Sequence, residues 1–280
     1  MRDIQKNVSD NRVSLSIGCF VHNLQSSGRG TTRVRNFLYS LRNQLKSNIQ
    51  ANIIIFNWSN DSSFNDIDDY CKEFNAIHIY KRFEGKIWNK SKSLNYSLKH
   101  YLSDYIMGTD IDYIFSPNFF QAVQSRLSRN RILLCGVHKL QPQDKDIIYS
   151  VENYKKILQR SVYYKNKEAD GASQIVSGEW FIEHRGYHEG IELWGGMDNE
   201  FSQLSRLWGL EQLWIDDKTT IIHQFHPDDK LDKSKSYYEF AHRVRQENIK
   251  ILRRKDKNRN SDDWGQIEID NINDWRNGGR

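Results

Sequence analysis

Two aspartates separated by one apolar residue, Asp110 and Asp112, are the side chains in this sequence best suited to hold a divalent cation. They follow an apolar segment at 104–108 whose length predicts a β-strand. In an open α/β sheet, ligands bind beyond the carboxyl ends of the strands, which is where these carboxylates would lie. Oxygen ligands of this type suit Mn²⁺ or Mg²⁺, and such an ion can also hold a diphosphate. Taken alone, the pair also fits a solvated turn.

Basic residues and histidines occur in an order that could complete this site. Lys90 and Lys92 begin a predicted helix at 88–102, one element before the aspartates, where ammonium groups would neutralise phosphate oxygens. His223 ends an apolar run, and its imidazole could join the two carboxylates around a metal ion. His226 lies three residues later and is the alternative ligand.

A third feature is an acid-bearing helix start behind a Trp-Gly-Gly turn. Its residues are, in order, Trp194, Gly195, Gly196, Met197, Asp198 and Glu200. Apolar side chains recur at helical spacing over 198–208, so both acids would lie in the first turn of a helix. Acids are also favoured there simply because they complement the helix dipole. A tryptophan between glycines can stack on a sugar ring, although packing is its commoner role.

The elements that must position these residues alternate between strand and helix in the first half of the sequence. Apolar runs of strand length occupy 13–21, 51–57, 76–80 and 104–108. Segments with helical periodicity, including 66–74 and 88–102, lie between them. This alternation predicts an α/β fold with a mostly parallel sheet. A further apolar run follows at 132–137, before the alternation breaks.

The second half is less regular and begins after a polar segment at 141–146. It contains a predicted helix at 151–160 and a short strand at 173–176. From residue 250 the sequence is dense in charge and then rich in asparagine and aspartate. We expect this tail to be either an arm packed on the surface or partly disordered.

Composition excludes several classes of protein. The 280 residues contain 41 Lys and Arg against 36 Asp and Glu, a net charge of +5 that is too mild and too scattered for a dedicated nucleic-acid-binding protein. Three cysteines without a Cys-x-x-Cys pair argue against a disulfide framework or a zinc ribbon. No stretch approaches the about 20 apolar residues of a membrane span. We therefore expect a cytoplasmic protein.

The order of these motifs resembles that of GT-A glycosyltransferases that use a nucleotide-sugar donor, over residues 13–227. The segment 177–200 is similar to the C-terminal signature of galactosyltransferases, bacterial chondroitin-polymerase-type enzymes and polypeptide N-acetylgalactosaminyltransferases. The resemblance implies a Rossmann-like central sheet flanked by helices. In those families an acid commonly follows the two glycines, whereas Met197 stands here, which leaves Asp198 as the expected functional carboxylate.

The resemblance also implies that different parts of the chain have different functions. Residues 1–140 would be the nucleotide-sugar-binding half of the domain, and residues 141–249 its acceptor-binding and catalytic half. Residues 250–280 would form a basic and then polar C-terminal tail. Its basic run at 250–255, together with Arg243 and Arg245, could hold the protein at an anionic membrane surface that carries a lipid-linked acceptor.

The roles that the resemblance implies for single residues fall into three groups. Asp110, Asp112 and His223 would bind the metal, with His226 as the alternative to His223. Donor binding would involve Asp61, Lys90, Lys92, Asn95, Asp110 and Asp112. Asp61 would read the base, although Asn57 stands where relatives often have an acid. The acceptor would bind at Trp194, Gly195 and Gly196, and the catalytic carboxylates would be Asp198 and Glu200.

The activity implied is transfer of a hexose or N-acetylhexosamine from a nucleotide diphosphate sugar, UDP-linked in the first instance, to a glycan or lipid-linked acceptor in surface polysaccharide synthesis. An inverting reaction would use Asp198 as base, and the cofactor would be Mn²⁺ or Mg²⁺. In a retaining enzyme Asp198 and Glu200 would instead bind the acceptor, and a member without activity would only bind sugar or nucleotide. A metal-dependent nucleotidyltransferase or phosphohydrolase would not need the Trp-Gly-Gly segment.

Overall fold

The computed structural model describes residues 12–24, 30–60, 62–85, 87–164, 170–193, 195–226, 235–254 and 260–277. Two of the predicted site residues, Asp61 and Trp194, lie outside the described residues. The other predicted site residues all lie within them, so their places can be compared with the predictions.

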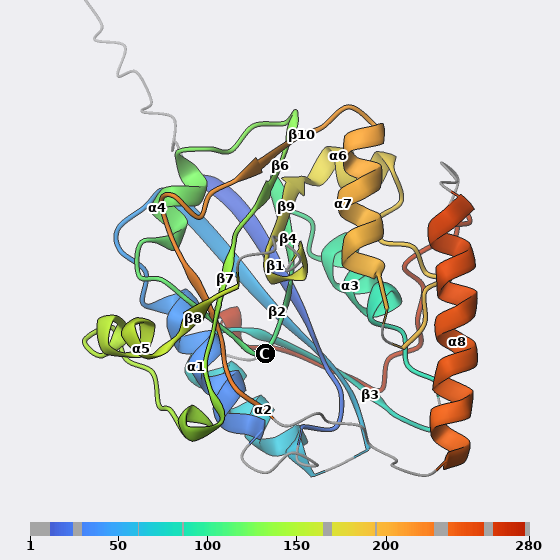
Figure 1. Cartoon of the computed structure of the whole chain (residues 1–280), viewed down its shortest axis with the longest axis horizontal. Helices are drawn as coiled ribbons and strands as arrows, with labels where there is room; N and C mark the ends of the chain where they lie inside the picture. Colours follow the sequence, from blue (N-terminus) through green and yellow to red (C-terminus); the bar gives the residue numbers. More distant parts are fainter. Residues whose placement is uncertain are drawn as a thin grey trace, which may run out of the picture.

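The central sheet has eight strands, and most of them are parallel. The strands are β1 (Val13–Val21), β2 (Ile49–Ser59), β3 (Ile77–Arg82), β4 (Tyr105–Asp110), β6 (Arg131–Leu134), β9 (Gln174–Ser177), β10 (Glu211–Trp214) and β12 (Asn271–Asp274). Their order is β10-β6-β9-β4-β1-β2-β3-β12 (Figure 1). Only β9 and β12 pair antiparallel with their neighbours. The predicted α/β fold with a mostly parallel sheet is therefore confirmed.

Helices cover both faces of this sheet, which gives three layers (Figure 1). The helices are α1 (Gly30–Arg42), α2 (Ser63–Glu73), α3 (Lys90–His100), α4 (Phe119–Gln124), α5 (Tyr154–Arg160), α6 (Gly178–Glu183), α7 (Met197–Leu207) and α8 (Lys235–Arg254). On one face, α1, α2 and α4 pack on the side chains of β1 that include Leu15 and Ile17. On the other, α3, α6 and α7 pack around Ile106 of β4. None of the described helices is both long enough and apolar enough to cross a bilayer.

The register of the parallel strands brings the predicted site to one edge of the sheet. Both faces of the sheet are covered, so β1 and β2 are almost continuously buried, as expected for interior parallel strands. Phe20 of β1 lies opposite Asp110, the last residue of β4, and Val21 lies opposite Asn57 of β2. The carboxyl ends of these three strands therefore meet at the same edge, where ligands bind in such sheets.

A second, smaller sheet adjoins this edge. Its strands are β5 (Tyr113–Phe115), β7 (Val137–Lys139), β8 (Val162–Tyr163) and β11 (Ile221–His223), in the order β5-β11-β7-β8. The apolar run at 132–137 is divided between the two sheets, because the chain leaves the central sheet after β6 and enters the small sheet as β7. Gly136 lies between them, where an added Cβ would approach the Tyr163 hydroxyl oxygen to 2.8 Å.

The C-terminal residues are more closely integrated than the predicted arm. Strand β12 extends the central sheet by pairing antiparallel with β3. Trp264 is buried, with its ring 5.7 Å from that of Phe181. Trp275 donates from its indole nitrogen to the Asp68 carboxylate at 3.0 Å. Packing of the buried Trp264 and the partly buried Trp275 fixes this segment to the sheet, although three of the four residues of β12 are asparagine or aspartate and have little β-propensity.

Candidate functional site

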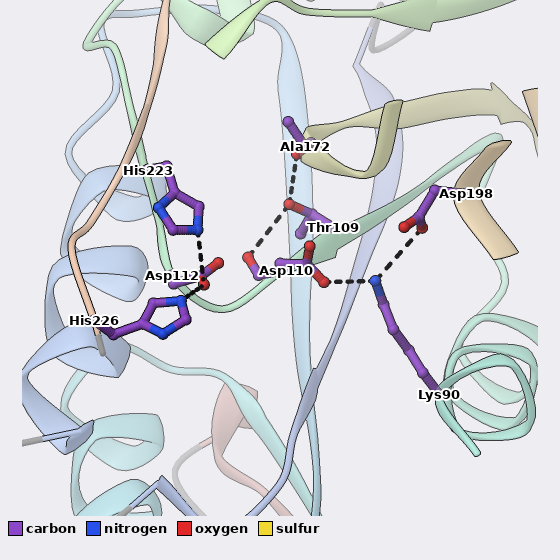
Figure 2. Close-up of polar contacts among 8 residues, drawn as sticks. All are labelled: Lys90, Thr109, Asp110, Asp112, Ala172, Asp198, His223 and His226. Carbon is purple, nitrogen blue, oxygen red and sulfur yellow. Dashed lines mark hydrogen bonds and ion pairs between the residues drawn. The ribbon is translucent and has the colours of Figure 1, made fainter. Parts of the chain in front are cut away.

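The two aspartates at the end of β4 point to different partners. Asp110 is the last residue of β4, and Asp112 follows in the turn that leads to β5. Ile111 between them is buried, which leaves the two carboxylates on either side of the chain. Figure 2 shows Asp112 directed toward two histidines and Asp110 directed toward Lys90. The site therefore has two adjacent parts.

The first part is the Asp112 group, formed by Asp112, His223 and His226. The Nε2 atoms of His223 and His226 lie 3.2 Å and 2.8 Å from Oδ2 of Asp112. One potential ligand atom from each residue lies within 4.8 Å of the others. Antiparallel pairing of β11 with β5 places His223 opposite Tyr113, and the Gln224 amide donates to the Asp112 carbonyl at 2.8 Å. Backbone pairing thus carries both histidines to the carboxylate.

The Asp112 group has the properties of a cation site. Although burial alone would raise it, the pKa of Asp112 is held well below its ordinary value by the charges and hydrogen bonds of His223 and His226. Its other carboxylate oxygen, Oδ1, is buried without a hydrogen-bond partner among the described residues. A buried, ionised oxygen without a partner, next to two imidazoles, fits a divalent metal ion. Both histidines that the sequence offered as alternatives lie here.

The second part is the Lys90 group, formed by Lys90, Asp110 and Asp198. The Lys90 ammonium lies 2.5 Å from Oδ1 of Asp110 and 3.5 Å from Oδ1 of Asp198. Burial lowers the pKa of Lys90, but the two carboxylates outweigh this effect and raise it. Desolvation raises the pKa of Asp110 to about 6 against the opposing charge of Lys90, with Asp198 and Asp112 adding to the rise. Asp110, predicted as a metal ligand, thus pairs with a cation of the protein.

The start of α3 fixes the position of Lys90. Asn89 caps the helix, and its side-chain oxygen accepts from the Lys92 amide at 2.8 Å. The Asn89 side chain also donates to the Glu189 carbonyl at 2.6 Å. Trp88 is buried in the cluster that includes Phe20 and Tyr96. An anchored cap therefore places the lysine as the first residue of the helix, with 16% of its side chain exposed.

Asp198 is positioned by contacts from three elements. Helix α7 begins after Gly196, whose φ of 92° is one that other residues rarely adopt. The Gln174 side chain, on β9, donates to the Asp198 carbonyl at 2.8 Å. A Cβ on Gly171 would lie 2.6 Å from Oδ2 of Asp198, so a larger residue there would displace this carboxylate from its position. No sequence pattern pointed to Gln174 or Gly171 as residues that position Asp198.

A hydrogen bond connects this glycine loop to the end of β4. The Thr109 hydroxyl donates to the Ala172 carbonyl at 2.6 Å, as Figure 2 shows. Thr109 is the residue before Asp110, so the loop under Asp198 and the strand that carries Asp110 are fixed to each other. The side chain of Asp198 remains 31% exposed. The two carboxylates around Lys90 are thereby held in one place, and both stay partly accessible, since the side chain of Asp110 is 36% exposed.

Three predicted residues lie away from these groups. Glu200 is buried on another side of α7, where it borders a small hollow with Leu204 and Ile251. Glu200 is therefore not brought together with Lys90 and Asp198, because side chains two positions apart on a helix point in nearly opposite directions. Lys92 lies toward the C-terminal segment: the pKa of Asp263 is lowered mainly by the Ser261 hydroxyl, with Lys92 adding positive charge.

Asn95 is the third of these residues and has a structural role. Its side chain is fully buried, and its amide nitrogen donates to the Tyr187 carbonyl at 2.8 Å and to Glu189 at 2.9 Å. Its oxygen accepts from the Tyr187 amide at 2.8 Å. These bonds hold the 187–189 segment against α3. Asn95, which the sequence suggested as a donor-binding residue, thus has its amide engaged inside the fold.

An aromatic group at the end of β1 was not recognised in the sequence. The His22 ring lies 4.6 Å from that of Phe83 and 5.4 Å from that of Trp88. Its Nδ1 is 2.5 Å from the carbonyl oxygen of Trp58, the residue that follows Asn57 on β2. Isolated histidines and aromatics in a sequence are most often packing residues, and only the meeting of strand ends brings these together. They lie next to the start of α3.

Comparisons with known proteins identify one family whose model matches this sequence and several solved structures with a similar fold. The family model described as Glycosyl transferase family 2 matches residues 31–189. No curated protein matches the sequence. Among solved structures, GalNAc-T7 with UDP, GalNAc and Mn²⁺ has a TM-score of 0.55 at 16% identity, covering 84% of this chain and 49% of its own.

Two further solved structures show the same fold. The mannosyltransferase PcManGT from Pyrobaculum calidifontis, in complex with GDP-Man and Mn²⁺, has a TM-score of 0.54 at 14% identity and covers 86% of this chain. TarS of S. aureus has a TM-score of 0.52 at 14% identity and covers 85%. The present chain spans 65% and 40% of their lengths. At these identities the likeness establishes the GT-A fold alone.

Proposed function

This chain belongs to glycosyltransferase family 2, and on that premise we propose that it transfers a hexose or N-acetylhexosamine from a nucleotide diphosphate sugar to a glycan or lipid-linked acceptor in surface polysaccharide synthesis. The observation that carries the proposal is the pair of adjacent groups at the end of β4. The Asp112 group is suited to a cation, and the Lys90 group combines an ammonium with the partly exposed Asp198. Three buried cysteines without a disulfide support a cytoplasmic setting.

The donor diphosphate would lie between the two groups. Asp112, His223 and His226 would hold Mn²⁺ or Mg²⁺, which when bound offsets negative charge on the diphosphate. Lys90 would donate to a phosphate oxygen from the other side, because its ammonium is already fixed at the strand end. Asp110 would accept from a hydroxyl of the donor. The ring of His22, which packs against the buried ring of Trp88, would offer a flat face to the base.

The nucleotide of the donor is proposed from the similar structures and from the residues near the end of β2. One similar structure is a complex with UDP and another with GDP-Man, and both contain Mn²⁺. We keep a UDP-linked sugar as the first donor to test. Asn57 is fully buried and lies 3.4 Å from the ring of His78, so it supports the sheet and does not face a base.

Asp198 would be the general base of an inverting displacement. As the acceptor oxygen attacks the anomeric carbon, its proton passes to the Asp198 carboxylate and the bond from this carbon to the diphosphate oxygen breaks. The electron pair leaves with the diphosphate, where Lys90 stabilises the developing charge. Glu200 lies on another side of α7, so Asp198 is the carboxylate of α7 that faces this site. This arrangement favours a single displacement over a retaining reaction.

A screen of donor hydrolysis tests the proposal. Purified protein would be incubated with UDP-, GDP- and dTDP-sugars in Mn²⁺, Mg²⁺ or EDTA, alongside Asp112→Ala and the surface control Asp217→Ala. We expect one nucleotide class to be hydrolysed only with the metal, by the wild type and the control but not by Asp112→Ala. Turnover that is independent of metal, or full activity of Asp112→Ala, would contradict the assigned cation site. Nucleotide binding without turnover would support a member that only binds.

A further inference from the structure

Helix α8 packs one side on the domain and exposes charge on the other. Its packed side includes Phe240, Val244, Asn248 and Leu252. The exposed charged residues are mostly basic: Arg243, Arg245, Lys250, Arg253 and Arg254, against Glu239 and Glu247. Figure 1 shows α8 beside α7 and α3. The helix therefore lays positive charge along the side of the domain where α7 begins.

Arg245 is the basic residue of α8 next to the glycine turn before Asp198. A Cβ on Gly195 would lie 3.9 Å from Cγ of Arg245 and 3.7 Å from the side-chain nitrogen of Asn248. A Cβ on Gly196 would approach Leu252 to 2.6 Å. Positions 245, 248 and 252 share one side of a helix, so this side of α8 faces the turn. Arg243 is two positions away and points elsewhere.

Arg245 also has no carboxylate partner among the described residues, a property that it shares with Arg243, Arg253 and Arg254 of α8, whereas several other surface arginines are paired. The pairs are Arg129 with Glu179, Arg131 with Glu211, Arg185 with Asp262 and Arg276 with Asp274. Arg245 forms no such pair within the part of the chain that the structure describes, and its side chain is exposed. A guanidinium carries five hydrogen-bond donors, and its planar fork matches carboxylate and phosphate oxygens.

We propose that Arg245 binds an anionic group of the acceptor, so that the acceptor of this enzyme is an acidic glycan carrying uronate carboxylates or phosphates. The inference rests on the proposed function, because it assigns a substrate class to the same site. The carboxylates of Asp110, Asp112 and Asp198 outnumber the one ammonium of Lys90, and the charge of the proposed metal would be offset by the donor diphosphate, so a further cation at the rim would favour an acidic acceptor. Arg245 supplies that cation beside the turn that precedes Asp198.

The same charges could attract an anionic membrane, but the apolar residues of α8 argue for the glycan. A helix that lies in a bilayer interface needs an exposed apolar face. The large apolar side chains of α8 that the structure describes, including Phe240, Ile249 and Leu252, are at least partly buried, and none is among the exposed hydrophobic residues. The outer face is charged and steers a soluble polyanion as readily as a lipid surface.

The test compares acidic probes with matched neutral ones. A hyaluronan tetrasaccharide and its carboxyl-reduced form are one pair, and glucose 6-phosphate and glucose are the other. Binding of each probe would be titrated with UDP and Mn²⁺ present, for the wild type, Arg245→Gln, Arg245→Lys and the control Arg243→Gln. The control removes the same charge from the same helix on another side. The two pairs distinguish carboxylate from phosphate as the source of the charge.

We expect the wild type to prefer one acidic probe by about 10-fold or more, the usual range for hydrogen bonds to a charged group. Arg245→Gln should remove the preference, Arg245→Lys should restore part of it, and Arg243→Gln should keep it. Melting temperatures would establish that each variant is folded.

Two results would overturn the inference. One is the absence of a preference for either acidic probe in the wild type. The other is an equal loss of the preference for the acidic probe in Arg243→Gln and Arg245→Gln, which would indicate a general effect of positive charge on α8. If both variants also lost binding to phosphatidylglycerol vesicles equally, α8 would be assigned to a membrane surface. Hydrolysis of the donor by the wild type without acceptor tests the proposed function separately.

Discussion

The Asp112 group and the Lys90 group contain aspartates that are only two residues apart in the chain, but the side chains around the two aspartates differ in kind. One carboxylate meets two imidazoles carried by the small sheet and the segment after it, with one of its oxygens left without a partner. In the other, an ammonium on a helix start lies between two carboxylates. The first arrangement has room for an external cation, whereas the second already contains its own.

This difference assigns separate tasks to the two aspartates of the Asp-x-Asp motif. The Asp112 group depends on β11, which pairs with β5 and is distant in sequence. The Lys90 group depends on two helix starts, that of α3 and that of α7. A variant of the Asp112 group should therefore change the affinity for the metal. A variant of the Lys90 group should change proton removal from the acceptor and stabilisation of the departing charge.

Asp198→Asn should have the largest effect, because it removes the proposed base. We expect kcat to fall by about 10²–10⁴-fold, the usual contribution of general base catalysis, while the nucleotide sugar still binds. Transfer rates and calorimetric donor titrations measure the two quantities. Glu200→Gln is the informative control, since Glu200 lies on another side of α7. A greater loss of kcat in a folded Glu200→Gln protein than in Asp198→Asn would reverse the assignment.

Lys90→Gln should follow, with a loss of about 10²–10³-fold in kcat, comparable with the removal of one donor that stabilises a developing negative charge. The substitution also leaves Asp110 and Asp198 without the cation between them. Steady-state kinetics with the hydrolysed donor would measure the effect, and Lys90→Arg should restore part of it. Lys92→Gln removes the same charge from the same helical turn and should change kcat little.

His223→Ala and His226→Ala act on the other group and should weaken Mn²⁺ binding more than they alter the Lys90 group. Loss of residues that support a metal ligand costs on the order of 10–100-fold in affinity, and we expect at least that for each histidine. Electron paramagnetic resonance titration of free Mn²⁺ gives the affinities. His242→Ala, on the exposed side of α8, is the control. Unchanged Mn²⁺ affinity in both single variants would separate the histidines from the metal.

Part of this site follows from local sequence. The apolar run before Asp110 has the length of a strand, and asparagine, as at position 89 before Lys90, is a common helix cap. Local sequence patterns are therefore sufficient to predict the end of β4 and the start of α3. The alternation of these elements also predicted the parallel core of the sheet. The strand-end rule then placed the aspartates and the lysine at one edge.

The remainder depends on packing between distant segments. Helical geometry separates Asp198 from Glu200, but the packing of α7 on the sheet decides which of the two faces Lys90. Nothing near Asn95 in sequence indicates that its amide is engaged by the 187–189 segment. The division of 132–137 between two sheets and the pairing of β12 with β3 are likewise results of long-range contacts, which periodicity does not encode.

The pair of Asp68 and His78 tests the comparison with the smallest expected effect, because a substitution there should change stability but not the affinity for Mn²⁺. It resembles the Asp112 group, with a carboxylate 3.0 Å from an imidazole, but its oxygen also accepts from Asn273 and Trp275. A carboxylate satisfied in this way offers no place to a cation, so Asp68→Asn should leave Mn²⁺ affinity unchanged. It should lower the free energy of unfolding by about 1 kcal/mol through weakened hydrogen bonds to the C-terminal segment.

The pH dependence of that stability has a definite sign. Burial would raise the pKa of Asp68, but hydrogen bonds from His78, Asn273 and Trp275 lower it below its ordinary value of 3.8. The ionised carboxylate therefore stabilises the fold above this value, and the contribution disappears as the pH falls through the lower pKa of the folded state. Urea unfolding between pH 7 and pH 3 should show the wild type and Asp68→Asn converging at the acid end. A constant difference would mean that the bonds to the C-terminal segment do not depend on the charge of Asp68.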